Sequence, residues 1–229
     1  MSIRALLFDL DDTLYDEKQF VKSGFAKVAE FIEEKFSINK KDFYKILIDI
    51  YNYGSRGNIF NLALKRENII FDEELICLMV KVYRGHNPKI KLNKDIELLL
   101  IKIREIYSLG IITDSYFEVQ KKKVQALKLE ELFDSIIYTD QYGREYWKPN
   151  ALGYKLALKE LDDILPEEAV YIGDNPYKDF IGAKKMGILT VRFLQPGREY
   201  SKVRLSKEYE ADYEVEKLSK IMNLLKVFE

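Results

Sequence analysis

The sequence predicts an α/β protein with a Rossmann-like, doubly wound parallel sheet and a bundle of helices inserted into it. The first observation is a near-continuous apolar run over residues 3–8, which is typical of a parallel strand buried on both faces. The second is a regular exchange of helical and strand-like segments from about residue 94 onward. The third is the stretch from about 17 to 86, where apolar residues recur only at helical spacing.

Composition and charge limit the classes of function. The chain has 229 residues, of which 47% are hydrophobic, enough for one large domain or a core domain with an insert. Its 37 Lys and Arg nearly balance its 38 Asp and Glu, so we expect no nucleic-acid partner. Without an uncharged run of about 20 residues or a signal-like start, we expect a cytoplasmic protein with no membrane contact. Both a monomer and a dimer are compatible with the sequence.

The inserted block is predicted to hold four or five helices. Its apolar residues fall three or four positions apart, as in Phe25, Val28 and Ile32, which is the pattern of an amphipathic helix. The glycine-bracketed segment 53–58 interrupts the block as a loop. Cys77, the only cysteine, is expected in an apolar core, and His86, the only histidine, is expected at the surface.

The remaining elements follow in order along the second part of the chain. We expect strands at the short runs of Ile, Val and Leu, and helices where apolar residues return to helical spacing. The predicted core domain consists of 1–15 and 90–229, and the predicted helical domain consists of 16–89. The predicted helices cover 95–106, 116–127, 151–161, 179–186 and 215–225. The predicted strands cover 109–113, 135–139, 169–172 and 189–193, with a further short strand before the closing helix.

Polar residues gather where the predicted strands end. In an open parallel sheet, ligands bind beyond the carboxyl ends of the strands. Because the segments are distant in sequence, we expect their side chains to meet only in the folded sheet. The residues in these positions are Asp9, Asp11, Thr113, Asp114, Ser115, Lys148, Gly173, Asp174 and Asn175, with Asp179 shortly after them. Asp114 is expected to cap the following helix, and the alternative is that it borders the site.

Carboxylates gathered at one edge repel one another unless a cation lies among them. Mg²⁺ is the expected cation, because it prefers oxygen ligands, keeps open positions and commonly binds phosphate. Lys148 and Thr113 would supply charge and a hydrogen bond to phosphate oxygens. A carboxylate can itself attack phosphorus and form an aspartyl-phosphate. The edge is therefore predicted to be a magnesium-dependent phosphate site.

Four short motifs resemble those of the haloacid dehalogenase-like (HAD) superfamily. The run DLDDT at 9–13 matches the DxDxT signature, and IITDS at 111–115 resembles the second motif. The KP pair at 148–149 resembles the third motif, and GDNPYKD at 173–179 resembles the fourth. The insertion between the first two motifs resembles the helical cap of the phosphoglycolate phosphatase-like branch.

The resemblance implies a role for each of these residues. Asp9 would be the nucleophile and a metal ligand, and Asp11 would be the general acid and base, with its carbonyl also on the metal. Thr113 would hold a phosphate oxygen, and Lys148 would neutralise charge on Asp9 and on the transferring phosphoryl group. Asp174 would complete the metal shell. The residues that would support this shell are Gly173, Asn175 and Asp179.

The predicted enzyme is a Mg²⁺-dependent phosphatase that hydrolyses a small phosphorylated metabolite through an aspartyl-phosphate. A phosphomutase shares every motif and differs mainly in water access. A 2-haloacid dehalogenase has no use for an acid at position 11, and a non-catalytic regulator would be expected to lack a motif residue. In the cap, Arg56 is a candidate for recognising the leaving group, and the alternative is a solvated arginine in a surface turn.

Overall fold

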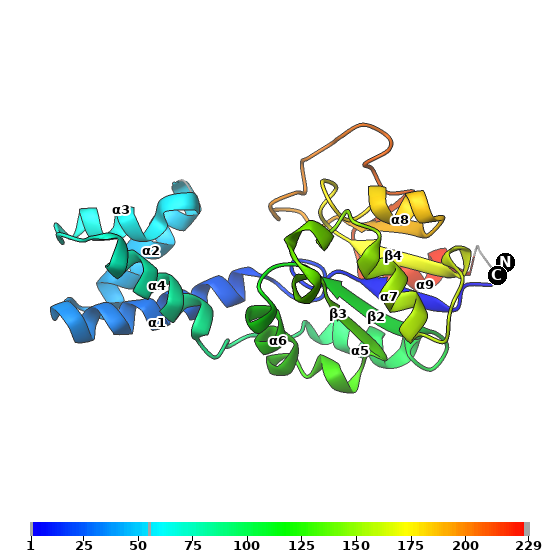
Figure 1. Cartoon of the computed structure of the whole chain (residues 1–229), viewed down its shortest axis with the longest axis horizontal. Coiled ribbons are helices and arrows are strands. Elements are labelled where there is room, and N and C mark those ends of the chain that lie inside the picture. The colour runs from blue at the N-terminus through cyan, green and yellow to red at the C-terminus, as the bar shows by residue number, and fades with distance from the viewer. Residues whose placement is uncertain (1, 55, 227–229) are drawn as a thin grey trace. The chain divides into compact units, whose positions relative to one another are not determined.

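A computed structural model of the chain describes residues 2–54 and 56–226, except for the side chain of Arg56. The chain divides into two compact units. One comprises the residues up to Asp16 together with those from Lys91 onward, and the other is Glu17–Ile90. The predicted boundaries lie one residue earlier at each junction. Figure 1 shows the order of the elements along both units.

The first unit is built on a six-stranded sheet in which every neighbouring pair of strands is parallel. The strand order is β3-β2-β1-β4-β5-β6, and all four residues of β1 are buried, as the apolar run requires. The predicted fold class is therefore confirmed. The strands are β1 (Ala5–Phe8), β2 (Ser108–Thr113), β3 (Ser135–Tyr138), β4 (Ala169–Gly173), β5 (Leu189–Phe193) and β6 (Tyr213–Val215).

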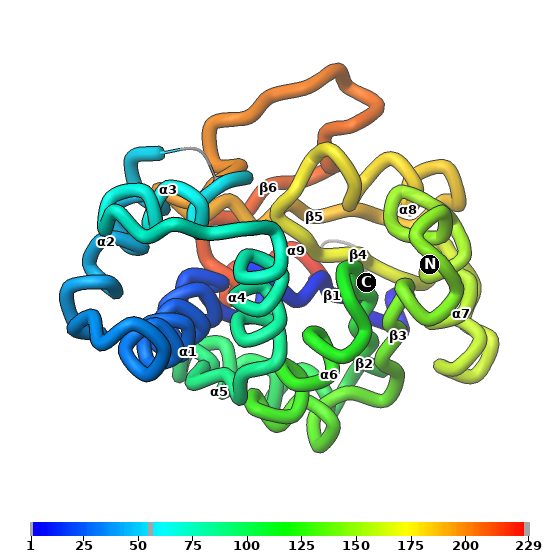
Figure 2. Tube along the Cα trace, turned by 60° about the vertical axis from the view of Figure 1, so that its left-hand side comes forward, coloured from blue at the N-terminus to red at the C-terminus, as the bar shows by residue number. Residues whose placement is uncertain are grey.

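Helices cover both faces of this sheet. They are α5 (Lys94–Ile103), α6 (Phe117–Ala126), α7 (Leu152–Glu160), α8 (Ile181–Met186) and α9 (Ile221–Leu225). Helices α7 and α8 lie on one face, and α5 and α9 lie on the other (Figure 1 and Figure 2). On the first face, Tyr154 of α7 packs edge-on against Tyr171 of β4, with ring centroids 5.1 Å apart. The double winding thus excludes water from both sides of the strands.

Two predicted helices begin two or more residues later in the chain than expected. The closing helix, predicted from residue 215, begins only at Ile221, because Tyr213–Val215 instead extend the sheet as a strand beside β5. The helix predicted from residue 179 begins at Ile181. Asp179 belongs to the preceding loop, where its carboxylate accepts a backbone hydrogen bond. Pairing and loop contacts outweigh helical periodicity at both positions.

The second unit is a bundle of helices with an apolar core of its own. This agrees with the helical block predicted after the first strand. Asp72 caps the last helix, since its carboxylate accepts the Leu75 N–H at 2.9 Å. The helices are α1 (Lys18–Phe36), α2 (Lys40–Tyr53), α3 (Ile59–Arg66) and α4 (Glu73–Gly85), with a 3₁₀ helix over Arg56–Asn58.

Two single residues of the helical unit lie where the sequence did not predict them. Cys77 is exposed, because Leu75 and Met79 of the same helix face the core instead. His86 is buried rather than at the surface, and its Nε2 lies 2.7 Å from Ser23 Oγ. A buried imidazole with a polar partner is satisfied, so this histidine has a structural explanation.

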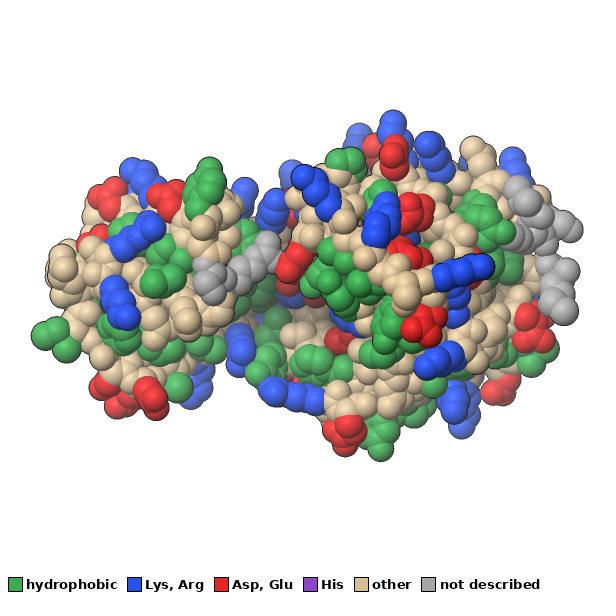
Figure 3. Space-filling model, turned by 90° about the horizontal axis from the view of Figure 1, so that it is seen from above, with side chains coloured by type: hydrophobic (Ala, Val, Ile, Leu, Met, Phe, Trp, Pro, Cys, Tyr) green, Lys and Arg blue, Asp and Glu red, His purple; other side chains and the backbone are tan. Residues whose placement is uncertain are grey.

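Charged side chains of both signs are interspersed over the face of the first unit that Figure 3 presents. This distribution agrees with the near balance of 37 basic and 38 acidic residues in the sequence. Neighbouring charges of opposite sign cancel within a short distance of the surface. Among residues 2–54 and 56–226, no helix is both long enough and apolar enough to cross a bilayer.

Candidate active site

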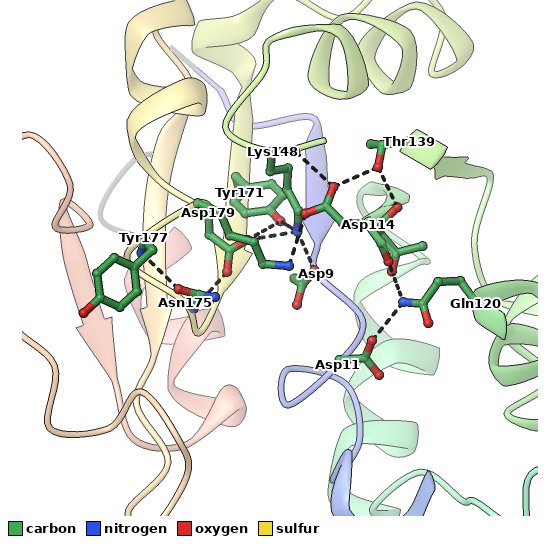
Figure 4. A network of polar contacts seen from close by, with 12 residues as sticks. Asp9, Asp11, Asp114, Gln120, Thr139, Lys148, Tyr171, Asn175, Tyr177 and Asp179 are labelled. Atoms are coloured by element: carbon green, nitrogen blue, oxygen red, sulfur yellow. Dashed lines mark hydrogen bonds and ion pairs between the residues drawn. The ribbon is translucent and has the colours of Figure 1, made fainter. Parts of the chain in front are cut away.

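The carboxyl ends of three central strands bring the predicted site residues together. Strand β1 pairs in parallel with both β2 and β4, so the three strands end at one edge of the sheet. Asp9 follows β1, Thr113 is the last residue of β2, and Asp174 follows β4. Figure 4 shows the resulting network of polar side chains at this edge. Residues that lie more than 100 positions apart in the sequence are thus neighbours.

Lys148 is the cation at the centre of the site. Its side chain is fully buried, and its Nζ contacts Asp9 Oδ1. It also donates hydrogen bonds to Asp179 Oδ1 at 2.9 Å and to Tyr171 OH at 2.7 Å. Burial alone would lower the pKa of Lys148, but the charges of Asp179 and Asp9 raise it well above its ordinary value. The lysine is therefore a fixed positive charge against the Asp9 carboxylate.

Asp9, Asp174 and Asp179 form a buried acidic cluster. One carboxylate oxygen from each lies within 4.8 Å of the other two. Burial raises the pKa of Asp9 to about 6 despite the opposing charge of Lys148. Burial, together with the charges of Asp179 and Asp9, raises the pKa of Asp174 to about 9. Bare charge is therefore unfavourable here, and either protons or a cation must offset it.

The cluster fits a divalent cation. Its donors are all oxygens, which hard cations prefer. Asp174 Oδ2 is buried and has no hydrogen-bond partner among the described residues. A buried acceptor without a donor is costly, and a metal ion would satisfy it. The family resemblance and this orphaned oxygen both point to a divalent metal site.

The GDNPYKD loop holds Asp179 against the cluster. Asp179 Oδ2 accepts a hydrogen bond of 2.9 Å from the Asn175 N–H. A Cβ at Gly173 would lie 2.5 Å from Asp179 Oδ2, so glycine is required for this approach. Asp179 was predicted to support the metal shell, and the geometry makes it a third member of the cluster.

The Asp11 carboxylate lies outside the acidic cluster and has hydrogen-bond donors of its own. Its carboxylate accepts hydrogen bonds from Lys123 Nζ at 2.7 and 2.9 Å, from Tyr15 OH at 2.6 Å and from Gln120 Nε2 at 2.8 Å. Burial alone would raise the pKa of Asp11, but the charge of Lys123 and these hydrogen bonds lower it. The described acidic cluster does not include the Asp11 carboxylate, and the predicted metal contact of this residue runs through its backbone carbonyl.

Asp114 belongs to the site and does not cap the helix that follows it, which has no side-chain cap. Its carboxylate accepts the Lys148 N–H at 3.0 Å, the Thr139 hydroxyl at 2.8 Å and Lys178 Nζ at 3.1 Å. It therefore ties the second motif to the third and fourth. Figure 4 shows Asp114 beside Lys148 and Thr139. Asp114 and Lys178 both lie inside quoted motifs, so their position was a usable signal.

Gln120, Lys123 and Tyr171 were missed, and the sequence held less information about them. Gln120 and Lys123 lie in the middle of a hydrophilic helix, where polar residues normally face water. Tyr171 lies inside an apolar strand, and the sequence therefore indicates an ordinary core residue. The side chain of Arg56, the predicted specificity residue, lies outside what the structure describes.

Comparison with known proteins shows which proteins this chain is similar to. The sequence profile of the haloacid dehalogenase-like hydrolases matches residues 6–193. The glyceraldehyde 3-phosphate phosphatase of Pyrococcus furiosus is 30% identical over 97% of this chain and 93% of its own length. The same enzyme of Pyrococcus abyssi is 33% identical over 99% of this chain and 94% of its own length.

A solved structure shares the fold across both units. YfnB of Bacillus subtilis, solved bound to magnesium, has a TM-score of 0.69 and 20% identity, covering 98% of this chain and 99% of its own. The prediction of a phosphatase agrees with the curated relatives. The predicted family is confirmed by a match that spans most of the sequence: the chain belongs to the haloacid dehalogenase-like hydrolases.

Proposed function

We propose that this phosphatase uses Mg²⁺ and a covalent aspartyl-phosphate on Asp9 to hydrolyse a small phosphorylated metabolite. One observation carries the proposal: three buried carboxylates lie within 4.8 Å of one another, and a fully buried lysine contacts two of them. A carboxylate beside a metal and a fixed positive charge is suited to attack a phosphate ester, whose own charge must be neutralised first.

Asp9, Asp174 and Asp179 would hold the metal ion, and the resemblance adds the carbonyl of Asp11. When bound, Mg²⁺ would neutralise the cluster and draw charge from the phosphoryl oxygens. The orphaned Asp174 Oδ2 supports this assignment. Magnesium bound to YfnB, which has the same fold, supports the choice of ion.

The protein's own residues would divide the reaction into two balanced steps. In the first, an Asp9 oxygen attacks phosphorus, the bond to the leaving oxygen breaks, and that oxygen takes a proton from Asp11. Asp11 must be protonated before this step, because Lys123 lowers its pKa in the resting protein. In the second, water attacks the phosphorus, its proton passes to Asp11, and the bond to Asp9 breaks to release phosphate. Lys148 would offset charge on the transferring group, and Thr113 would hold one of its oxygens.

For the substrate, we propose a triose phosphate. The two glyceraldehyde 3-phosphate phosphatases are 30% and 33% identical to this chain over nearly its whole length. We further propose that the unit Glu17–Ile90 is the cap domain that selects the leaving group, the part of the ester that differs between metabolites. Arg56 in this unit remains the candidate residue for recognising the leaving group.

The test is release of inorganic phosphate from glyceraldehyde 3-phosphate and from p-nitrophenyl phosphate, with Asp9→Asn as the blank. EDTA should abolish both activities, and Mg²⁺ should restore them. Ca²⁺ should support them poorly, because its looser coordination shell misplaces the nucleophile. Full activity in EDTA after exhaustive dialysis would refute the metal requirement. A phosphorylated isomer in place of free phosphate would identify a mutase.

The covalent intermediate has its own test. Beryllium fluoride, which mimics a phosphoryl group on a carboxylate, should form an adduct with the wild type in the presence of Mg²⁺. It should form none with Asp9→Asn. An adduct that maps to Asp11 instead would show that the nucleophile and the acid have been assigned in the wrong order.

A further inference from the structure

Helix α6 carries two buried polar side chains that the reaction described above does not use. Gln120 is 1% exposed and Lys123 is 3% exposed, whereas Lys121 and Gln125 of the same helix are exposed. Gln120 and Lys123 are three residues apart, so they lie on one face of the helix. Burial of an ammonium group is costly unless it is paired, so the position of Lys123 requires an explanation.

The partner of both side chains is Asp11. Lys123 Nζ reaches Oδ1 at 2.7 Å and Oδ2 at 2.9 Å, and Gln120 Nε2 reaches Oδ2 at 2.8 Å. Tyr15 OH adds a 2.6 Å hydrogen bond to Oδ1. Each carboxylate oxygen therefore accepts two hydrogen bonds, and rotation of the carboxylate would break several of them.

Gln120 also connects Asp11 to the second motif. The same Nε2 donates to Thr113 Oγ1, while Gln120 Oε1 is buried without a hydrogen-bond partner among the described residues. Figure 4 shows the Gln120 amide directed toward the Asp11 carboxylate. A buried amide oxygen without a hydrogen bond destabilises the folded protein. Packing alone therefore does not favour a glutamine at this position, which points to a role for its amide group.

We infer that Gln120 and Lys123 are positioning residues for the acid–base group: they hold the Asp11 carboxylate in one orientation, and Gln120 sets its spacing from the Thr113 hydroxyl. The inference rests on the proposed phosphatase function. Asp11 lies in the loop after β1, next to Asp12, whose φ of +54° is in the left-handed region. Without donors from a rigid helix, its side chain would sample several rotamers. Proton transfer requires a fixed approach within hydrogen-bond reach, which these donors would provide.

The test compares two esters that need the acid to different degrees. p-Nitrophenolate is a stable anion and leaves readily without a proton. The alkoxide formed from a triose phosphate is far more basic and needs a proton in order to leave. Each variant is measured across pH and compared at its own optimum, because loss of the Lys123 charge also shifts the pKa of Asp11. There Lys123→Met and Gln120→Met should each lower kcat/KM for the alkyl ester about tenfold or more, which is part of the loss expected when an acid–base group is removed. For p-nitrophenyl phosphate the loss should stay within about threefold, because the nucleophile is untouched. Lys121→Met and Gln125→Met, on the exposed side of the same helix, should match the wild type.

A double variant shows whether Lys123 acts through Asp11. Asp11→Asn combined with Lys123→Met should lose no more activity than Asp11→Asn alone, because the second change removes a support for a group already lost. Lys123→Arg, which keeps the charge and can bridge both oxygens, should restore most of the alkyl-ester activity. Additive losses, or equal losses on both esters, would refute positioning and leave a role in stability alone.

A measurement without turnover separates this inference from the proposed function. In protein labelled with ¹³C at aspartate carboxyls, the Asp11 signal, assigned by its loss in Asp11→Asn, should shift in Lys123→Met and stay in place in Lys121→Met. If the enzyme is active and the Asp11 signal does not move, the positioning inference fails while the phosphatase proposal stands. If the signal moves but Asp9→Asn is as active as the wild type, the proposed mechanism fails instead.

Discussion

Replacement of Asp174 by asparagine should change how the stability of the metal-free protein depends on pH. The pKa of Asp174 in the folded protein is about 9, raised from 3.8 by burial and by the charges of Asp179 and Asp9. Between these two values the folded, metal-free protein binds a proton that the unfolded chain does not. Its free energy of unfolding must therefore fall as pH rises through this window.

The size of the expected change in stability follows from a difference of one bound proton between the folded and the unfolded protein. Each pH unit in this window removes about 1.4 kcal/mol from the free energy of unfolding. From pH 6.5 to 8, the wild type in EDTA should lose about 2 kcal/mol more than Asp174→Asn, whose amide binds no proton. Saturating Mg²⁺ should remove this difference in slope, because a metal-bound Asp174 carries no proton in the folded state either.

The assay is urea unfolding at several pH values, in EDTA and in Mg²⁺, for the wild type and Asp174→Asn. Asp95→Asn, an exposed aspartate in the same unit, is the matched control and should give the slope of the wild type. Parallel pH dependences for the wild type and Asp174→Asn in EDTA would show that Asp174 is already ionised without metal. The reasoning from its burial would then be wrong.

Three further predictions test other parts of the site. Gly173→Ala should lower Mg²⁺ affinity, measured by calorimetry, because a Cβ 2.5 Å from Asp179 Oδ2 displaces that carboxylate; unchanged affinity would contradict the close approach. Asp114→Ala should lower the free energy of unfolding by about 2–3 kcal/mol in urea titrations, since Lys178 and two other donors lose a charged acceptor. Arg56→Ala should raise KM for the true substrate about tenfold and leave p-nitrophenyl phosphate nearly unaffected; equal effects on both esters would exclude a role in specificity.

The order of elements and the position of the motifs could be predicted from the sequence, because both depend on local patterns. A parallel strand buried on both faces needs a continuous apolar run, and Ala5–Phe8 shows one. Helical periodicity marked the inserted block, and the motif residues stood at strand ends. A short strand was expected before the closing helix, but Val215 was assigned to the helix, whereas it pairs with β5 as the last residue of that strand.

Only the tertiary structure shows which of the site residues lie next to one another. The sequence placed four carboxylates at one edge, but only the fold separates Asp11, held by Lys123, from the cluster that contains Asp179. Burial of Lys123 depends on a carboxylate 112 positions away in the sequence, and no local pattern encodes that distance. Composition and periodicity report whether a residue is suited to a core or a surface. Packing between distant segments determines which charged groups pair in the interior, so these pairs are visible only in the folded chain.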